Sequence, residues 1–217
     1  MSEKNNTLVF NDLQFDLANK EQLQSFKETY AKGSSIAEFS NFISIIKATK
    51  LNPFKREIWC VKYKDNPAQI FIGRDGYRKV AKQHKDYIYH RLDVICENDE
   101  VEVENGKLIK HKYSFKDRGA ILGAYCIVKK KGYEDEIFNY VDFEEYNTGM
   151  SKWKTSPKTM IKKVAEAQTL RMVFDELLEG TYDESENYTQ EVQTGSEAER
   201  EKASEILEKI TSEKLDK

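Results

Sequence analysis

The sequence contains few of the residues that crosslink a secreted protein or carry a chain across a membrane. Only three cysteines and three prolines occur in 217 residues. Cys60, Cys96 and Cys126 each stand alone in a strand-like segment, which favours reduced core thiols over a disulfide framework. No apolar run approaches the roughly 18 residues of a membrane-spanning helix, and the N-terminal residues lack the pattern of a secretory signal. We therefore expect a cytoplasmic protein without a membrane partner.

Motifs for common enzyme chemistry are also missing. The chain has no GxxxxGK[ST] loop for a nucleotide, no Gly-x-Ser-x-Gly elbow and no Cys/His pair, and its three histidines lack metal-ligand spacing. A metal-dependent nuclease could be built from Asp75, Asp93 and Glu97, although their spacing does not require one. Asp75, in an Asp-Gly pair, is more simply a turn or helix-cap residue. We predict a protein that is not an enzyme and requires no cofactor.

Charge is distributed unevenly along the chain. The net charge is −3 and the pI is about 5.8, yet residues 1–178 carry 30 Lys and Arg against 26 Asp and Glu, a net charge of +4. Residues 179–217 carry 5 against 12, a net charge of −7. Residues 151–174 hold six cations and one acid, Glu166. A local basic patch of this kind matters more for nucleic-acid binding than the overall pI.

Residues 51–84 give the clearest local pattern. Pro53 fixes the end of a preceding helix. Two strand-like runs, 57–63 and 69–72, flank a Lys-Asp-Asn-Pro turn and predict a β-hairpin. Apolar residues then recur at helical spacing among cations, which predicts a basic helix over 75–83. On pattern alone, an ordinary α+β core with solvated lysines explains the segment equally well.

The flanking segments predict further helices and strands. Helices are expected over 21–31 and 35–50, the second opened by a Ser35–Glu38 capping box. The apolar stripe of the second helix is Ile36, Phe39, Phe42, Ile43 and Ile46. Alternating residues and turn signals then predict an antiparallel meander, with strands over 87–97, 107–115, 120–130 and 136–141.

The block after residue 151 predicts the longest helix. Pro157 suits its first turn, and the helix should continue to Leu178. The face expected to be apolar is Met160, Val164, Ala167, Phe174 and Leu178; the face opposite is Lys158, Lys162, Ala165 and Thr169. Arg171 falls within the apolar stripe, where a charge must pair with a buried carboxylate or reach a wet groove. The pattern leaves open whether Arg171 binds a carboxylate or a phosphate.

The fold class follows from these elements. We predict an α+β domain over residues 1–182, with N-terminal helices, an antiparallel meander with an inserted helix, and a long basic C-terminal helix. Residues 183–217 are acidic and poor in apolar side chains, which predicts a linker followed by a short tail helix over 196–215.

The basic residues are interleaved with aromatic ones, including Trp59, Tyr77, Tyr146 and Trp153. Such a composition is typical of proteins that bind single-stranded nucleic acid, where cations follow phosphates and rings stack on bases. No recognition helix or zinc finger is visible, so sequence-independent binding is expected.

Two blocks in combination carry a family resemblance. LNPFKREI followed by IGRDGYRKVA, and WKTSPKTMIKKVAEAQTLRMVF further on, resemble the Bet/RecT group of phage single-strand annealing proteins. The resemblance spans about residues 36–183. It implies ATP-independent binding of single-stranded DNA and annealing through a duplex intermediate held in a basic groove. It also implies a homo-oligomeric ring or helical filament, with a phage exonuclease and a host single-strand-binding protein as candidate partners. Mg2+ would at most assist DNA binding.

The resemblance also suggests site residues. It aligns Arg56, Lys158, Lys162 and Arg171 with basic family positions, and Trp153 with a tryptophan that contacts DNA or packs before the helix. For Arg171, the resemblance favours a DNA phosphate over a buried carboxylate as the partner. Val164 departs from the family pattern, which has a lysine there. Three further candidates, Arg74, Arg78 and Lys152, rest on local charge alone. The predicted DNA-binding set is Arg56, Arg74, Arg78, Lys152, Trp153, Lys158, Lys162 and Arg171. The alternative functions are a phage assembly protein that uses its sheet to bind protein, and a metal-dependent nuclease.

Overall fold

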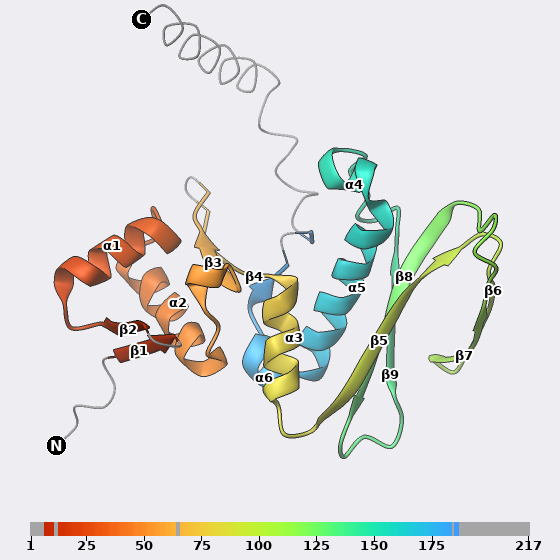
Figure 1. Ribbon diagram of the computed structural model, residues 1–217, viewed down its shortest axis with the longest axis horizontal. Coiled ribbons are helices and arrows are strands. Elements are labelled where there is room, and N and C mark those ends of the chain that lie inside the picture. The colour runs from red at the N-terminus through yellow and green to blue at the C-terminus, as the bar shows by residue number, and fades with distance from the viewer. Residues whose placement is uncertain (1–6, 11–12, 64–65, 184, 187–217) are drawn as a thin grey trace, which may run out of the picture. The chain divides into compact units, whose positions relative to one another are not determined.

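The computed structural model describes residues 7–10, 13–63, 66–183 and 185–186. The chain divides into a compact unit, Met1–Glu186, and a second unit, Asn187–Lys217. The predicted tail helix and nearly all of the predicted linker lie outside the described residues. The first unit mixes helices with antiparallel strands, so the α+β class is confirmed (Figure 1).

The N-terminal elements are a strand pair and two helices. Strands β1 (Thr7–Phe10) and β2 (Leu13–Asp16) pair antiparallel and precede α1 (Lys20–Tyr30) and α2 (Ile36–Thr49). Both helices were predicted, and the Ser35–Glu38 capping box is present. The other four residues of the predicted apolar stripe of α2 are buried, but Ile36 is 84% exposed. Its assignment to the core was wrong, because helical periodicity continues past the point where packing ends.

The first signature block folds as a tight unit. A 3-10 turn, η1 (Pro53–Lys55), leads into the predicted hairpin of β3 (Ile58–Val61) and β4 (Gln69–Ile72), and α3 (Arg74–Gln83) follows directly. Gly76 lies where α3 approaches the hairpin. A Cβ there would come within 2.5 Å of the Glu57 carbonyl oxygen. Strand β10 (Thr181–Tyr182) pairs parallel with β4, which the sequence did not indicate.

The strands after α3 do not form one continuous meander, so that prediction was wrong. The main sheet has the order β5-β8-β9, from β5 (Tyr87–Cys96), β8 (Ile121–Lys130) and β9 (Ile137–Asp142), all antiparallel. A separate hairpin of β6 (Glu100–Glu104) and β7 (Lys107–Lys112) is inserted between β5 and β8. Alternation located most of the strands but could not identify which ones pair, because pairing joins segments far apart in the chain.

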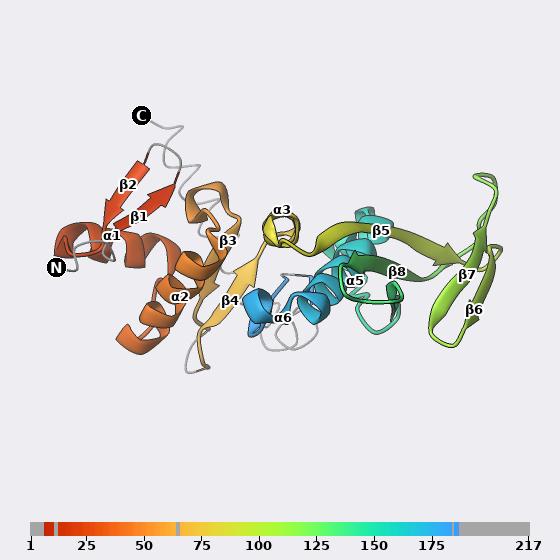
Figure 2. The same cartoon turned by 90° about the horizontal axis from the view of Figure 1, so that it is seen from below.

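The second signature block forms a short helix, α4 (Ser151–Thr155), and then α5 (Pro157–Val173). Figures 1 and 2 show α5 between the β5-β8-β9 sheet and α3, and it contacts both. The predicted helix stops at Phe174, before α6 (Asp175–Leu178). Ala165 and Thr169, predicted opposite the core, are fully buried. The two-faced description was therefore wrong over the second half of α5: Thr169 hydrogen-bonds to Cys126 of β8, so the side predicted to lie opposite the core packs against the main sheet.

Candidate nucleic-acid interface

A buried carboxylate, Glu166, lies at the centre of the basic region. Its side chain is 1% exposed, in the middle of α5. Arg74 donates from Nε to Oε2 at 2.5 Å, and Arg78 donates from Nε to Oε1 at 2.5 Å and from Nη2 to Oε2 at 3.2 Å. His90 Nε2, on β5, lies 2.9 Å from Oε1. One carboxylate thus joins α3, α5 and the main sheet.

The charges of this cluster do not cancel. Burial of Glu166 opposes its ionisation, but hydrogen bonds from His90, Arg78 and Arg74 outweigh burial and lower the pKa of Glu166 to about 2. At neutral pH one anion therefore faces two guanidinium cations. The side chains of Arg74 and Arg78 remain 26% and 33% exposed. Glu166 and its two arginines therefore carry a net positive charge, which faces the exposed carboxylate of Asp75 at the surface of α3.

The two arginines contact Glu166 mainly through their inner edges. Arg74 uses only Nε, and neither of its terminal nitrogens bonds to any residue that the structure describes. Arg78 uses Nε and one terminal nitrogen; the other, Nη1, lies 4.0 Å from the 92%-exposed carboxylate of Asp75. Terminal N–H donors are therefore available to an anion from outside.

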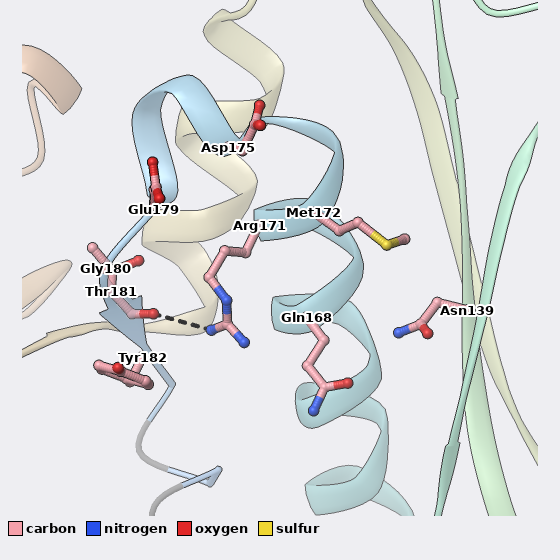
Figure 3. A pocket seen from close by; sticks show the side chains of 9 residues that line it. All are labelled: Asn139, Gln168, Arg171, Met172, Asp175, Glu179, Gly180, Thr181 and Tyr182. Carbon is pink, nitrogen blue, oxygen red and sulfur yellow. Dashed lines mark hydrogen bonds between the residues drawn. The ribbon is translucent and has the colours of Figure 1, made fainter.

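Arg171 is bound in the opposite manner. Its Nη1 donates to Glu186 Oε1 and to the Thr181 carbonyl, both at 3.1 Å, and its Nη2 donates to Glu186 Oε2 at 2.7 Å. Figure 3 shows the side chain reaching from α5 toward Thr181 and Tyr182, in a hollow of about 490 Å³ that Gln168 and other side chains line. Of the two partners left open for Arg171, the structure shows the carboxylate; its predicted contact with DNA stays a prediction.

The other predicted cations lie at the surface. Arg56 is exposed, in the left-handed region (φ 55°), with its guanidinium carbon 5.8 Å from the centre of the Trp59 ring. Among the described residues it has no carboxylate partner. Lys152 and Lys158 are exposed and Lys162 is half-buried. These cations are available to solvent, as a phosphate contact requires.

Two of the aromatic candidates are in the core. Trp153 is 3% exposed and packs 6.0 Å from Phe143, centre to centre; its contact with DNA stays a prediction. Tyr77 is fully buried, with its hydroxyl 3.4 Å from the Thr181 hydroxyl. Helical spacing with Val80 and Ala81 places it on the core face of α3, as the sequence pattern predicted.

The residue that sequence reasoning missed is Glu166. It was visible as the lone acid among six cations over residues 151–174. A single carboxylate in a basic helix is a signal for a buried partner, but the partners lie about 90 residues upstream, and no local pattern identifies them.

The carboxylates considered for a nuclease are not assembled. Asp75 is exposed on α3, Asp93 accepts a hydrogen bond from the Tyr113 hydroxyl at 2.7 Å, and Glu97 accepts one from the Ala120 amide at 3.0 Å. Across the described ranges, no group of three or more His, Cys, Asp or Glu side chains could hold a metal ion. Nor is any helix in those ranges long and apolar enough to cross a membrane.

Comparison with protein families gives a match over most of the chain. The model of the RecT family matches residues 16–204, which is most of the chain and includes both signature blocks and every residue of the candidate interface. No curated protein matches the sequence.

Proposed function

Because the chain belongs to the RecT family, whose members anneal DNA strands in phage-type recombination, we propose that it binds single-stranded DNA and anneals complementary strands without ATP. The observation that carries the proposal is the surplus of exposed guanidinium charge around Glu166. Arg74 and Arg78 come from the first signature block and Glu166 from the second, and α5 also carries the exposed Lys158 and the half-buried Lys162. The sites proposed to bind phosphates are Arg56, Arg74, Arg78, Lys152, Lys158, Lys162 and, after release from Glu186, Arg171.

The physical mechanism requires no cofactor. Cations that follow the phosphates release counterions and bind strands of any sequence. When two strands share one basic surface, the protein reduces the repulsion between their backbones. Base pairing then selects the complementary strand.

Assembly would strengthen this effect. Each subunit offers few contacts, but a ring or filament of subunits along one strand gives many weak contacts a large combined avidity. We propose such a homo-oligomer in the cytoplasm, where reduced cysteines are stable, working with a phage exonuclease and a host single-strand-binding protein. Mg2+ would act only by screening DNA charge.

Binding of a fluorescein-labelled oligothymidylate at several salt concentrations tests the proposal. Six to eight phosphate contacts predict a slope of about −4 to −6 in the logarithm of the binding constant against that of salt. Arg56→Gln and Lys158→Gln should each weaken binding and lower the slope by about 1, whereas Lys20→Gln, an exposed lysine on α1, should change neither. A folded protein that does not bind the oligonucleotide would refute the proposal and favour an assembly role; cleaved strands in Mg2+ would indicate a nuclease.

A further inference from the structure

We propose that Glu166 is a positioning residue: it holds Arg74 and Arg78 as a pair of guanidinium groups that together bind one phosphate of the DNA backbone. The inference rests on the proposed function and goes beyond it, because it assigns a role in DNA binding to a buried acid. We call Arg74 and Arg78 the arginine fork.

The geometry places the two guanidinium groups side by side. Arg74 and Arg78 are four residues apart on α3 and therefore share one face of the helix. Both donate to the same oxygen, Oε2 of Glu166, Arg74 through Nε and Arg78 through Nη2. Their positions are thus fixed relative to each other by a group that is itself buried and held by His90.

Several N–H donors of the arginine fork are not used by Glu166. A guanidinium carries five N–H donors in a fixed plane. Glu166 accepts hydrogen bonds from one nitrogen of Arg74, Nε, and from two nitrogens of Arg78, Nε and Nη2. The remaining donors include both terminal nitrogens of Arg74. A planar donor edge that is already oriented suits a phosphate, which accepts two parallel hydrogen bonds.

The charge balance also points to an anion from outside. If Glu166 served only to tie α3 to α5, one arginine would neutralise it. The second arginine adds a cation next to the first, which costs energy through repulsion. Apart from Glu166, the ion pairs among the described residues give it only the carboxylate of Asp75, which is 92% exposed and 4.0 Å from Arg78 Nη1. A phosphodiester carries a single negative charge, so it would balance the cluster at two cations and two anions. Lys162 and Lys163 lie one turn before Glu166 on α5 and are half-buried, so the same part of the helix carries further cations.

The proposal predicts an effect of unusual sign. Replacing an acid by its amide removes negative charge, which ordinarily strengthens DNA binding. Glu166→Gln should instead weaken it, by about fivefold to tenfold. The amide keeps one accepting oxygen and replaces the other with a donating NH2 group, so one arginine loses its acceptor and the arginine fork loses its orientation. Asp75→Asn is the matched control. It removes the same charge beside the same arginine without touching the bonds to Glu166, and should leave binding unchanged or tighter.

The experiment measures fluorescence anisotropy of a fluorescein-labelled oligothymidylate with the full chain, after circular dichroism has shown that each variant is folded at the assay temperature. Weaker binding by Glu166→Gln together with unchanged or tighter binding by Asp75→Asn supports the proposal. Binding by folded Glu166→Gln that equals or exceeds the wild type overturns it.

A second variant decides the matter if Glu166→Gln does not fold. Arg74→Lys keeps the charge, but its single ammonium cannot hold both Glu166 and a phosphate at the geometry of the arginine fork. Arg74→Lys should weaken DNA binding by a similar factor. An affinity for the oligonucleotide equal to that of the wild type would overturn the proposal. Suppose that the wild type binds DNA and that Arg56→Gln and Lys158→Gln weaken this binding. If Glu166→Gln and Arg74→Lys then leave binding unchanged, the proposed role of Glu166 is wrong but the proposed function stands. If the wild type does not bind, the proposed function fails as well.

Discussion

Arg171 gives both terminal nitrogens of its guanidinium to the carboxylate of Glu186, at 3.1 and 2.7 Å. The side chain of Glu186 is only 8% exposed. In this arrangement the carboxylate occupies the same edge of the guanidinium that a phosphate would use. Arg74 presents the opposite case, since its inner nitrogen is bonded and its outer ones are open.

Glu186→Gln should therefore release Arg171. If Arg171 contacts DNA in the bound state, the variant will bind single-stranded DNA a few-fold more tightly, with a salt slope steeper by about 1, because one more cation becomes available. Glu179→Gln, an exposed acid that lines the same hollow, is the control for charge alone. Equal binding by both variants in an oligonucleotide titration would show that Arg171 has a structural role.

Acid should destabilise the protein over a defined range. Glu166 has an ordinary pKa of 4.5 and a folded pKa of about 2, so its contribution is complete above about pH 4.5 and is lost as the pH falls toward 2. A shift of this size corresponds to about 3 kcal/mol. Asp99 acts in the same direction: burial opposes its ionisation, but hydrogen bonds from Arg118 and His111 lower its pKa to about 2. Urea unfolding between pH 7 and pH 3 measures the effect, and a free energy of unfolding that stays constant from pH 5 to pH 3 would contradict it.

Gly76→Ala should be destabilising, although alanine normally favours a helix by about 1 kcal/mol relative to glycine. The new Cβ would meet the Glu57 carbonyl oxygen at 2.5 Å and Ile72 Cγ2 at 2.8 Å, so α3 must move away from the hairpin. Overpacking of this kind costs about 1–3 kcal/mol. Thermal melting should show a lower Tm for Gly76→Ala and little change for Lys82→Ala, which is exposed on the same helix. A wild-type Tm for Gly76→Ala would mean that this close packing is not needed.

The three cysteines should be inert in the folded protein. All are free and buried, and burial raises the pKa of Cys60 to about 11 and that of Cys126 to about 12. Since the thiolate is the reactive species, a thiol reagent at pH 8 should label the native chain slowly and label all three positions in urea. Rapid labelling without denaturant would show that the core opens readily.

Local signals predicted much of the fold. Ser35 and Glu38 defined the start of α2, the Lys-Asp-Asn-Pro turn located the hairpin, and Pro157 marked the start of α5. In each case the information lies within a few residues of the feature itself. The surface cations of the candidate site could be identified in the same way, because charge and spacing are local properties.

Long-range contacts could not be predicted. The pairing of β5 with β8 skips over an entire hairpin, and β10 joins β4 across more than 100 residues. The burial of Thr169 depends on the main sheet, where it hydrogen-bonds to Cys126, and the bonds of Glu166 depend on Arg74 and Arg78. Periodicity assigns a residue to a face of its own helix but does not say what covers that face.

The annealing reaction itself tests the central claim most directly. Two complementary oligonucleotides, one with a fluorophore and one with a quencher, are mixed without nucleotide at low and high salt, with the wild type and with the Arg74→Ala, Arg78→Ala double variant. The account predicts that the wild type accelerates quenching, that salt reduces the acceleration, and that the folded double variant loses most of it. Quenching by the folded wild type no faster than that of the free strands would contradict strand annealing as the function.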